Sequence, residues 1–84
     1  ALAAELGKDG VRVNAIGPGL IETKLNAEAR ARNPEMVATV MRHTPLGRAG
    51  QPQDVAGPAV FLASDLAAYV TGCIVMADGG FRTV

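Results

Sequence analysis

The sequence predicts an α/β fold in which helices cover a parallel sheet, as in doubly wound domains. Residues 1–19 give the first observation, since a helical start, a short turn, a β-rich run and a Gly/Pro loop follow one another there. The second is the run 73–77, which is apolar at every position and is therefore typical of a buried parallel strand. Aromatic residues make up only 4% of the chain, so the core must rest on aliphatic side chains, which suit the layer between helices and a sheet.

Composition limits the classes of protein that remain. The 84 residues allow one small domain, which buries only roughly 60–65% of its unfolded surface. Eight basic residues balance eight acidic ones, which argues against a nucleic-acid partner. The chain has no apolar stretch near the ~20 residues of a membrane span and no signal peptide, so we expect a cytoplasmic protein without membrane contact. Cys73 is the only cysteine, which excludes an internal disulfide and a cysteine metal cluster; we expect it to be a buried small hydrophobe and expect no metal site.

Residues 1–6 are strong helix formers, with Leu2 and Leu6 on one face. No capping residue precedes them, so we expect the chain to open in the middle of a longer helix. Gly7 is predicted to stop this helix, and Asp9 and Gly10 to form a turn.

The β-rich run 11–16 is predicted to be a strand whose alternate residues face opposite sides, and Gly17-Pro18-Gly19 is expected to break it. Ligands of doubly wound folds lie at the carboxyl ends of the strands. A cofactor should therefore be sought in the loop after Ile16.

The next segment changes character, because residues 26–32 are Ala-rich and polar. Asn33 is predicted to be an N-cap with Pro34 at the first helical position, and a short amphipathic helix is expected to run to about His43. The turn 44–47 ends it. This segment has room to form a lid over a pocket, or it simply covers the edge of the sheet; the sequence leaves both interpretations open.

A further helix is predicted from Gln51, with Pro52 at its first position and Asp54 complementing the helix dipole. Pro58 cannot donate a backbone hydrogen bond, so we expect a bend between Asp54 and Pro58. Ser64-Asp65 closes this helix, and the last strand, 73–77, ends at a turn in which we expect Asp78 to order Gly79-Gly80.

Three stretches now stand in order: VRVNAIGPG at 11–19, PLGRAGQPQDVA at 45–56, and YVTG at 69–72 followed by DGG at 78–80. Together they closely resemble the final third of the short-chain dehydrogenase/reductase family, above all sugar and polyol dehydrogenases and 3-oxoacyl carrier-protein reductases. The resemblance implies that residues 1–84 are the carboxyl-terminal segment of one dinucleotide-binding, Rossmann-type domain whose amino-terminal half lies outside this sequence.

The resemblance also implies a cofactor, NAD or NADP, bound beside the loop after the first strand. The stretch matching Pro18-Gly19 lies beneath the nicotinamide ring in the family, and the backbone matching Ile21 bonds the ring's carboxamide. The hydroxyl matching Thr23 bonds the carboxamide or a phosphate; the alternative for Thr23 is a local cap of the following segment. Residues 24–44 would be the variable substrate loop.

The family's glycine-rich phosphate loop, its serine, and its tyrosine with a lysine four residues later match no part of this sequence. Tyr69 is the only tyrosine, and Cys73 lies four residues after it, so we expect no catalytic residue within the chain and no turnover by these 84 residues alone. His43, Arg48 and Asn14 are expected to have structural roles: His43 at a helix end, Arg48 between loops and Asn14 against nearby backbone.

The function that follows is part of an NAD(P)-dependent oxidoreductase that moves a hydride between nicotinamide and an alcohol or carbonyl substrate. The apolar stripe of Val55, Ala59 and Leu62 and the last strand would supply an oligomer surface, so a homo-oligomer, often a tetramer in the family, is expected. The alternative is a non-catalytic remnant or oligomerisation module that is stable only with a partner chain.

Overall fold

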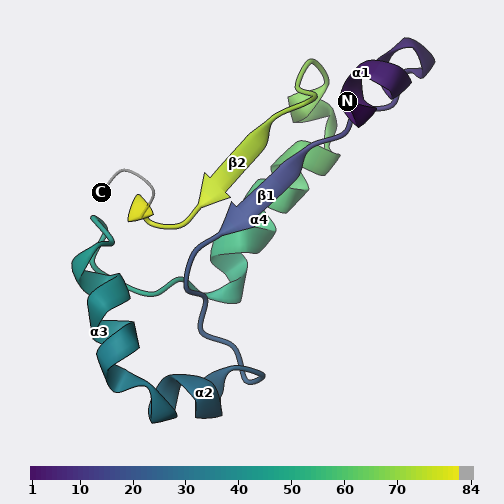
Figure 1. Ribbon diagram of the computed structural model, residues 1–84. Helices are drawn as coiled ribbons and strands as arrows, with labels where there is room; N and C mark the ends of the chain where they lie inside the picture. Colours follow the sequence, from purple (N-terminus) through teal and green to yellow (C-terminus); the bar gives the residue numbers. More distant parts are fainter. Residues whose placement is uncertain (82–84) are drawn as a thin grey trace.

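The computed structural model describes residues 1–81, and it confirms an α/β fold with a parallel pair of strands (Figure 1). The elements in chain order are α1 (Leu2–Leu6), the 3-10 turn η1 (Gly7–Asp9), β1 (Ala15–Pro18), α2 (Ala27–Arg32), α3 (Pro34–Arg42), α4 (Pro52–Ala63), the 3-10 turn η2 (Asp65–Ala67) and β2 (Ile74–Ala77). Helix α4 runs alongside both strands, while α2 and α3 lie beyond their carboxyl ends (Figure 1).

The two strands pair in parallel from Ala15 opposite Ile74 to Pro18 opposite Ala77. Parallel strands need a long crossover connection, and here it carries the three helices α2, α3 and α4. Both strands therefore end at the same edge of the sheet, and the loops after Pro18 and Ala77 meet there.

Strand β1 begins later than the predicted run 11–16 and continues into the segment that was expected to break it. The preceding residues are extended but bond partly to side chains instead of to a regular ladder. The Val13 amide donates to Thr71 Oγ1 at 3.0 Å, and its carbonyl accepts from the Gly72 amide at 2.8 Å. Gly17 and Pro18 join the ladder because the parallel register places them opposite Met76 and Ala77.

The Asn14 side chain has the structural role expected of it. Its Nδ2 donates to the Val70 carbonyl at 3.0 Å, and its Oδ1 accepts from the Cys73 amide at 3.1 Å. One amide group thus replaces two ladder contacts just before the regular register begins.

Strand β2 was expected to be fully buried, and this expectation was wrong. Ile74 is 66% exposed and Met76 37% exposed, and Cys73 is only partly buried. Among residues 1–81, α4 is the helix that packs on both strands, so the alternate side chains of β2 on the other face lack a covering layer.

Helix α1 ends at Leu6 with Gly7 as its C-cap, as predicted, but the backbone of Gly7 is not left-handed. Gly7 keeps a right-handed helical backbone (φ −59°), and the chain turns at Gly10, which has φ of +76° and donates from its amide to the Gly7 carbonyl. The helix tightens into η1 before it ends, so the left-handed residue comes three positions later, where only glycine adopts this conformation without strain.

Helices α3 and α4 begin at Pro34 and Pro52 as predicted. Asn33 precedes α3, but its Nδ2 donates to the Ala29 carbonyl at 2.7 Å instead of its side chain capping α3. The reason is that α2 ends at the same residue, so its free carbonyls compete for the side chain. Pro58 lies inside α4, whose helical span runs unbroken to Ala63.

The buried apolar core of residues 1–81 is small and consists of Leu62 and Ala67. Arg12 braces the end of α4: its Nη1 donates to the Leu62 carbonyl at 2.7 Å, and further contacts of 3.4 Å reach Ser64 and Val70. Within the described part of the chain, every helix is too short or too polar to cross a bilayer.

Candidate functional site

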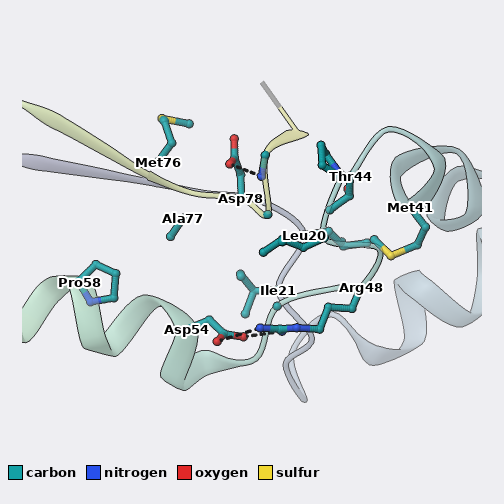
Figure 2. Close-up of a pocket in the computed structure, with 16 residues that line it drawn as sticks. Leu20, Ile21, Met41, Thr44, Arg48, Asp54, Pro58, Met76, Ala77 and Asp78 are labelled. Carbon is teal, nitrogen blue, oxygen red and sulfur yellow. Dashed lines mark hydrogen bonds and ion pairs between the residues drawn. The ribbon is translucent and has the colours of Figure 1, made fainter. Parts of the chain in front are cut away.

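A cavity of about 530 Å³ opens at the edge where both strands end (Figure 2). Its wall comes from four parts of the chain: the loop after β1, the end of α3 with its following turn, the start of α4, and the end of β2 with its following turn. The lining residues are Gly19, Leu20, Ile21, Met41, Thr44, Pro45, Leu46, Arg48, Gly50, Asp54, Pro58, Met76, Ala77, Asp78, Gly79 and Gly80.

The loop after β1 is held against the segment before α4 by a short parallel bridge between Ile21 and Gly50. The Glu22 amide donates to the Gly50 carbonyl at 2.9 Å, and the Gly50 amide donates to the Leu20 carbonyl at 2.8 Å. Because this bridge uses the peptide groups of the residues on either side of Ile21, Ile21's own N–H and C=O point away from it.

Pro18 and Gly19 lie where β1 leaves the sheet. Pro18 pairs with Ala77, and the Gly19 amide donates to the Ala77 carbonyl at 3.0 Å. A Cβ atom on Gly19 would lie 2.8 Å from the Cα of Asp78, so the two chain segments approach too closely for any side chain. Gly19 therefore has a packing reason for its identity, independent of any ligand.

Thr23 has the geometry of a local cap, the alternative that the sequence left open. Its amide donates to Asn26 Oδ1 at 3.0 Å, and its Oγ1 accepts from the Asn26 amide at 3.2 Å. These reciprocal bonds follow the capping-box pattern ahead of α2. The cap uses the hydroxyl as an acceptor, so the hydroxyl proton remains available to a ligand.

Sequence reasoning missed a polar network behind this loop. Glu22 Oε1 accepts from Gln51 Nε2 at 2.7 Å, and Glu22 Oε2 pairs with Arg30 at 3.3 Å. Arg30 also donates to Asn26 Oδ1 at 2.8 Å and to the Thr23 carbonyl at 3.3 Å. The spacing of Thr23 and Asn26 and the i,i+4 spacing of Asn26 and Arg30 are patterns that indicate part of this network, whereas the contact with Gln51 spans 29 positions and has no local pattern.

Arg48 and Asp54 pair across the cavity wall at 2.8 Å (Figure 2). The Arg48 guanidinium, together with the Gln51 amide at 2.7 Å, lowers the pKa of Asp54 to about 2. Asp54 is therefore a charged cap of α4 and a partner for Arg48, and Arg48 ties two loops together, as the sequence indicated. Neither group is set up for proton transfer near neutral pH.

The remaining polar candidates have structural contacts. His43 Nδ1 lies 2.8 Å from the Thr39 carbonyl at the end of α3, and Asp78 Oδ1 accepts from the Gly80 amide at 3.0 Å, which orders the final turn (Figure 2). Tyr69 is fully exposed. Over residues 1–81, no three His, Cys, Asp or Glu side chains gather as metal ligands.

The four residues predicted to contact a cofactor lie between the end of β1 and the start of α2 but differ in position. Gly19 and Ile21 line the cavity, whereas Pro18, the last residue of β1, and Thr23, farther along the loop, lie outside the set of residues that forms its wall. The Ile21 peptide groups and the Thr23 hydroxyl offer one carbonyl acceptor and two donors, the kinds of group that complement a neutral amide.

Comparison with known proteins gives a consistent picture. A family profile described as enoyl-(acyl carrier protein) reductase matches residues 1–82. Galactitol 2-dehydrogenase (L-tagatose-forming) of Cereibacter sphaeroides is 49% identical over 96% of this chain and 32% of its own length. For 3beta-hydroxysteroid dehydrogenase 1 of Eggerthella lenta, the identity is 51% over 94% of this chain and 30% of the relative.

Solved structures show the same likeness. An Agrobacterium tumefaciens protein, provisionally named a 2-deoxy-D-gluconate 3-dehydrogenase and crystallised with bound NADP, superposes with a TM-score of 0.91 at 42% identity. The match covers 99% of this chain and 33% of that protein. The chain therefore spans about a third of the length of the relatives it matches.

Proposed function

This chain belongs to the short-chain dehydrogenase/reductase family, and from that premise we propose that it is part of an NAD(P)-dependent oxidoreductase acting on an alcohol or carbonyl substrate. The observation that carries the proposal is the loop after β1, whose bridge to Gly50 does not use the Ile21 N–H or C=O. The N–H can therefore donate to an amide, and the carbonyl, which accepts from Asn26, keeps a second lone pair for it. When bound, the nicotinamide supplies the hydride that is exchanged with the substrate carbon. We further propose that residues 1–84 form the carboxyl-terminal segment of one dinucleotide-binding domain.

The loop residues would have separate roles toward the cofactor. Pro18 and Gly19 would form the floor beneath the nicotinamide ring, as the resemblance implies, and the place of Gly19 on the cavity wall supports this role. The Ile21 amide and carbonyl would bond the carboxamide, and the Thr23 hydroxyl would donate its remaining proton to the carboxamide or a phosphate oxygen. An amide fixed by both donors and acceptors presents one ring face to the substrate.

Residues 24–44 would form the substrate lid. Met41 and Thr44 support this proposal because they place the end of α3 and the turn after it on the wall of the cavity that Ile21 also lines (Figure 2). Covering the sheet edge is the simpler alternative, and it predicts that substitutions at Met41 leave substrate preference unchanged. The relatives named above act on a sugar alcohol and a steroid respectively, which supports a small-molecule substrate without selecting one.

A second candidate function is a non-catalytic module that is stable only against a partner chain, and one observation favours it. Among residues 1–81 only Leu62 and Ala67 are buried apolar residues, while Val60 is 68% exposed and Phe61 42% exposed. These surfaces need apolar cover, from a further part of the same polypeptide or from a second subunit.

We propose a homo-oligomer, a tetramer by family likeness, and a cytoplasmic location.

Calorimetric titration of the natural protein with NADH and NADPH tests the proposed function. We expect one of them to bind, and we expect Thr23→Val to weaken that binding about three- to tenfold, the effect of one lost hydrogen bond. Thr39→Val is the matched control, because Thr39 is exposed on α3 and its hydroxyl donates to the Glu35 carbonyl. No binding of either dinucleotide would contradict the proposal, and an intact mass near three times that of these 84 residues would exclude the remnant. The isolated chain should not oxidise or reduce any substrate.

A further inference from the structure

Asn26 lies behind the proposed cofactor loop and contacts the two residues assigned to the nicotinamide amide. We propose that Asn26 is a positioning residue, which presets the Ile21 carbonyl and the Thr23 hydroxyl for that amide without touching the cofactor itself. This inference rests on the proposed function, and it adds a residue for which the resemblance implies no role.

The contact with Ile21 fixes the direction of a carbonyl. Asn26 Nδ2 donates to the Ile21 carbonyl oxygen at 2.7 Å. A carbonyl oxygen has two lone pairs, so one bond to Asn26 leaves the second lone pair for another donor. The bridge to Gly50 holds the same peptide from the opposite side, and the Ile21 carbonyl is thereby held between two anchored segments.

The contacts with Thr23 decide which way its hydroxyl acts. The Asn26 amide donates to Thr23 Oγ1 at 3.2 Å, while the Thr23 amide donates to Asn26 Oδ1 at 3.0 Å. With a lone pair of Oγ1 engaged, the hydroxyl proton is directed elsewhere and can serve as a donor. Asn26 therefore sets an acceptor at Ile21 and a donor at Thr23, which complement the NH₂ and C=O of a carboxamide.

Asn26 is itself held in place by charged side chains. Arg30 Nε donates to Asn26 Oδ1 at 2.8 Å, which also fixes which end of the side-chain amide is oxygen. Glu22 pairs with Arg30 at 3.3 Å and accepts from Gln51 at 2.7 Å, so the brace reaches the first residue before α4. The Arg30 side chain is only 24% exposed, which strengthens these charge-assisted bonds relative to a surface pair.

The arrangement requires an amide at position 26, since one end donates and the other accepts. Asn26→Asp keeps the oxygen that accepts from Thr23 and Arg30 and keeps the backbone amide. It removes the donor to Ile21 and places a carboxylate oxygen against the carbonyl oxygen. The substitution thus changes the Ile21 contact selectively at nearly constant shape.

The test compares three ligands on the natural full-length protein by calorimetry. They are the preferred dinucleotide, its 3-acetylpyridine analogue, in which a methyl group replaces the carboxamide NH₂, and ADP-ribose (with the 2′-phosphate if NADPH is preferred), which has no nicotinamide. We expect Asn26→Asp to weaken the dinucleotide about three- to tenfold, as for one lost hydrogen bond. Binding of the analogue and of ADP-ribose should change less than about twofold, because neither has the NH₂ group that meets the Ile21 carbonyl.

Asn33→Asp is the matched control, since Asn33 ends the same helix and donates to the Ala29 carbonyl away from the loop. It should change none of the three affinities. An equal loss for all three ligands in Asn26→Asp would show a general structural role and overturn the proposal, and so would an unchanged dinucleotide affinity. Should Asn26→Asp fail to fold, the unmodified protein still tests the contact between the carboxamide NH₂ and the Ile21 carbonyl. It must bind the dinucleotide at least about threefold more tightly than the analogue. Equal binding of the two ligands would refute the role of the Ile21 carbonyl and, with it, the proposal for Asn26. Failure of the unmodified protein to bind any dinucleotide would instead refute the proposed function, on which this inference depends.

Discussion

Replacing Arg12 with Met should lower the free energy of unfolding by about 2–4 kcal/mol. The main term is the bond from Arg12 Nη1 to the Leu62 carbonyl at 2.7 Å, since a hydrogen bond from a charged donor contributes about 1.5–3 kcal/mol. The contacts of 3.4 Å to Ser64 and Val70 are near the distance limit and add little. A cation at the end of α4 also interacts with the helix dipole, which contributes about 0.3–1 kcal/mol.

Urea denaturation of the natural protein, followed by circular dichroism, measures this loss as a lower midpoint at constant slope. Arg42→Met is the control, because Arg42 is exposed and its Nη2 donates to the Thr39 hydroxyl within the same helix; its effect should stay within about 0.5 kcal/mol. Arg12→Lys should recover part of the stability, since it keeps the charge but not the fork of donors. Equal midpoints for Arg12→Met and Arg42→Met would refute the argument that Arg12 holds the end of α4.

Two further predictions concern the site. Because Arg48 and the Gln51 amide lower the pKa of Asp54 to about 2, its carboxylate stabilises the fold fully above about pH 4, and this contribution is lost as the pH falls toward 2. The difference in urea midpoint between the natural protein and Asp54→Asn should therefore shrink over that range, and a constant difference would contradict the pairing. Gly19→Ala should cost about 1–3 kcal/mol, because its Cβ would lie 2.8 Å from the Cα of Asp78. Gly7→Ala should be neutral or stabilising in the same assay, because a Cβ atom at this position would meet nothing within 4 Å and the backbone is helical. A loss of stability in Gly7→Ala would contradict the helical conformation of Gly7.

The parts of the fold that the sequence predicted well are those with local causes. Pro34 and Pro52 mark the starts of α3 and α4 because a proline at the first helical position loses no hydrogen bond. Gly7 ends α1 and Gly10 forms a turn, as predicted, but the sequence did not show that the chain tightens into η1 between them, which makes Gly10 the left-handed residue. The start of β1 was misplaced because the side chains of Thr71 and Asn14 replace ladder bonds, and a pattern of alternating residues does not show such replacements.

The residues proposed to bind the cofactor came from the family resemblance, whereas the contacts that hold them in place came from the structure. Gly19 and Ile21 line the cavity, but the brace of Glu22 by Gln51 joins residues far apart in the sequence, and only folding reveals it. For Thr23, the local cap and the contact with a cofactor do not exclude each other. A hydroxyl that caps the turn before α2 as an acceptor keeps its proton, so the local cap and the proposed ligand contact are compatible.

The two ends of the proposed lid are anchored by different kinds of contact. Its start is held by the polar network around Asn26, and its end by Thr44, which is buried and donates from Oγ1 to the Val40 carbonyl at 2.7 Å. Beyond Thr44, the Leu46 amide donates to the Gly79 carbonyl at 3.1 Å, which ties the chain to the turn after β2. Most of α2 and α3 between these anchors is exposed. Substitutions on those exposed faces can therefore alter the surface offered to a substrate while the contacts that fix the loop after β1 stay the same.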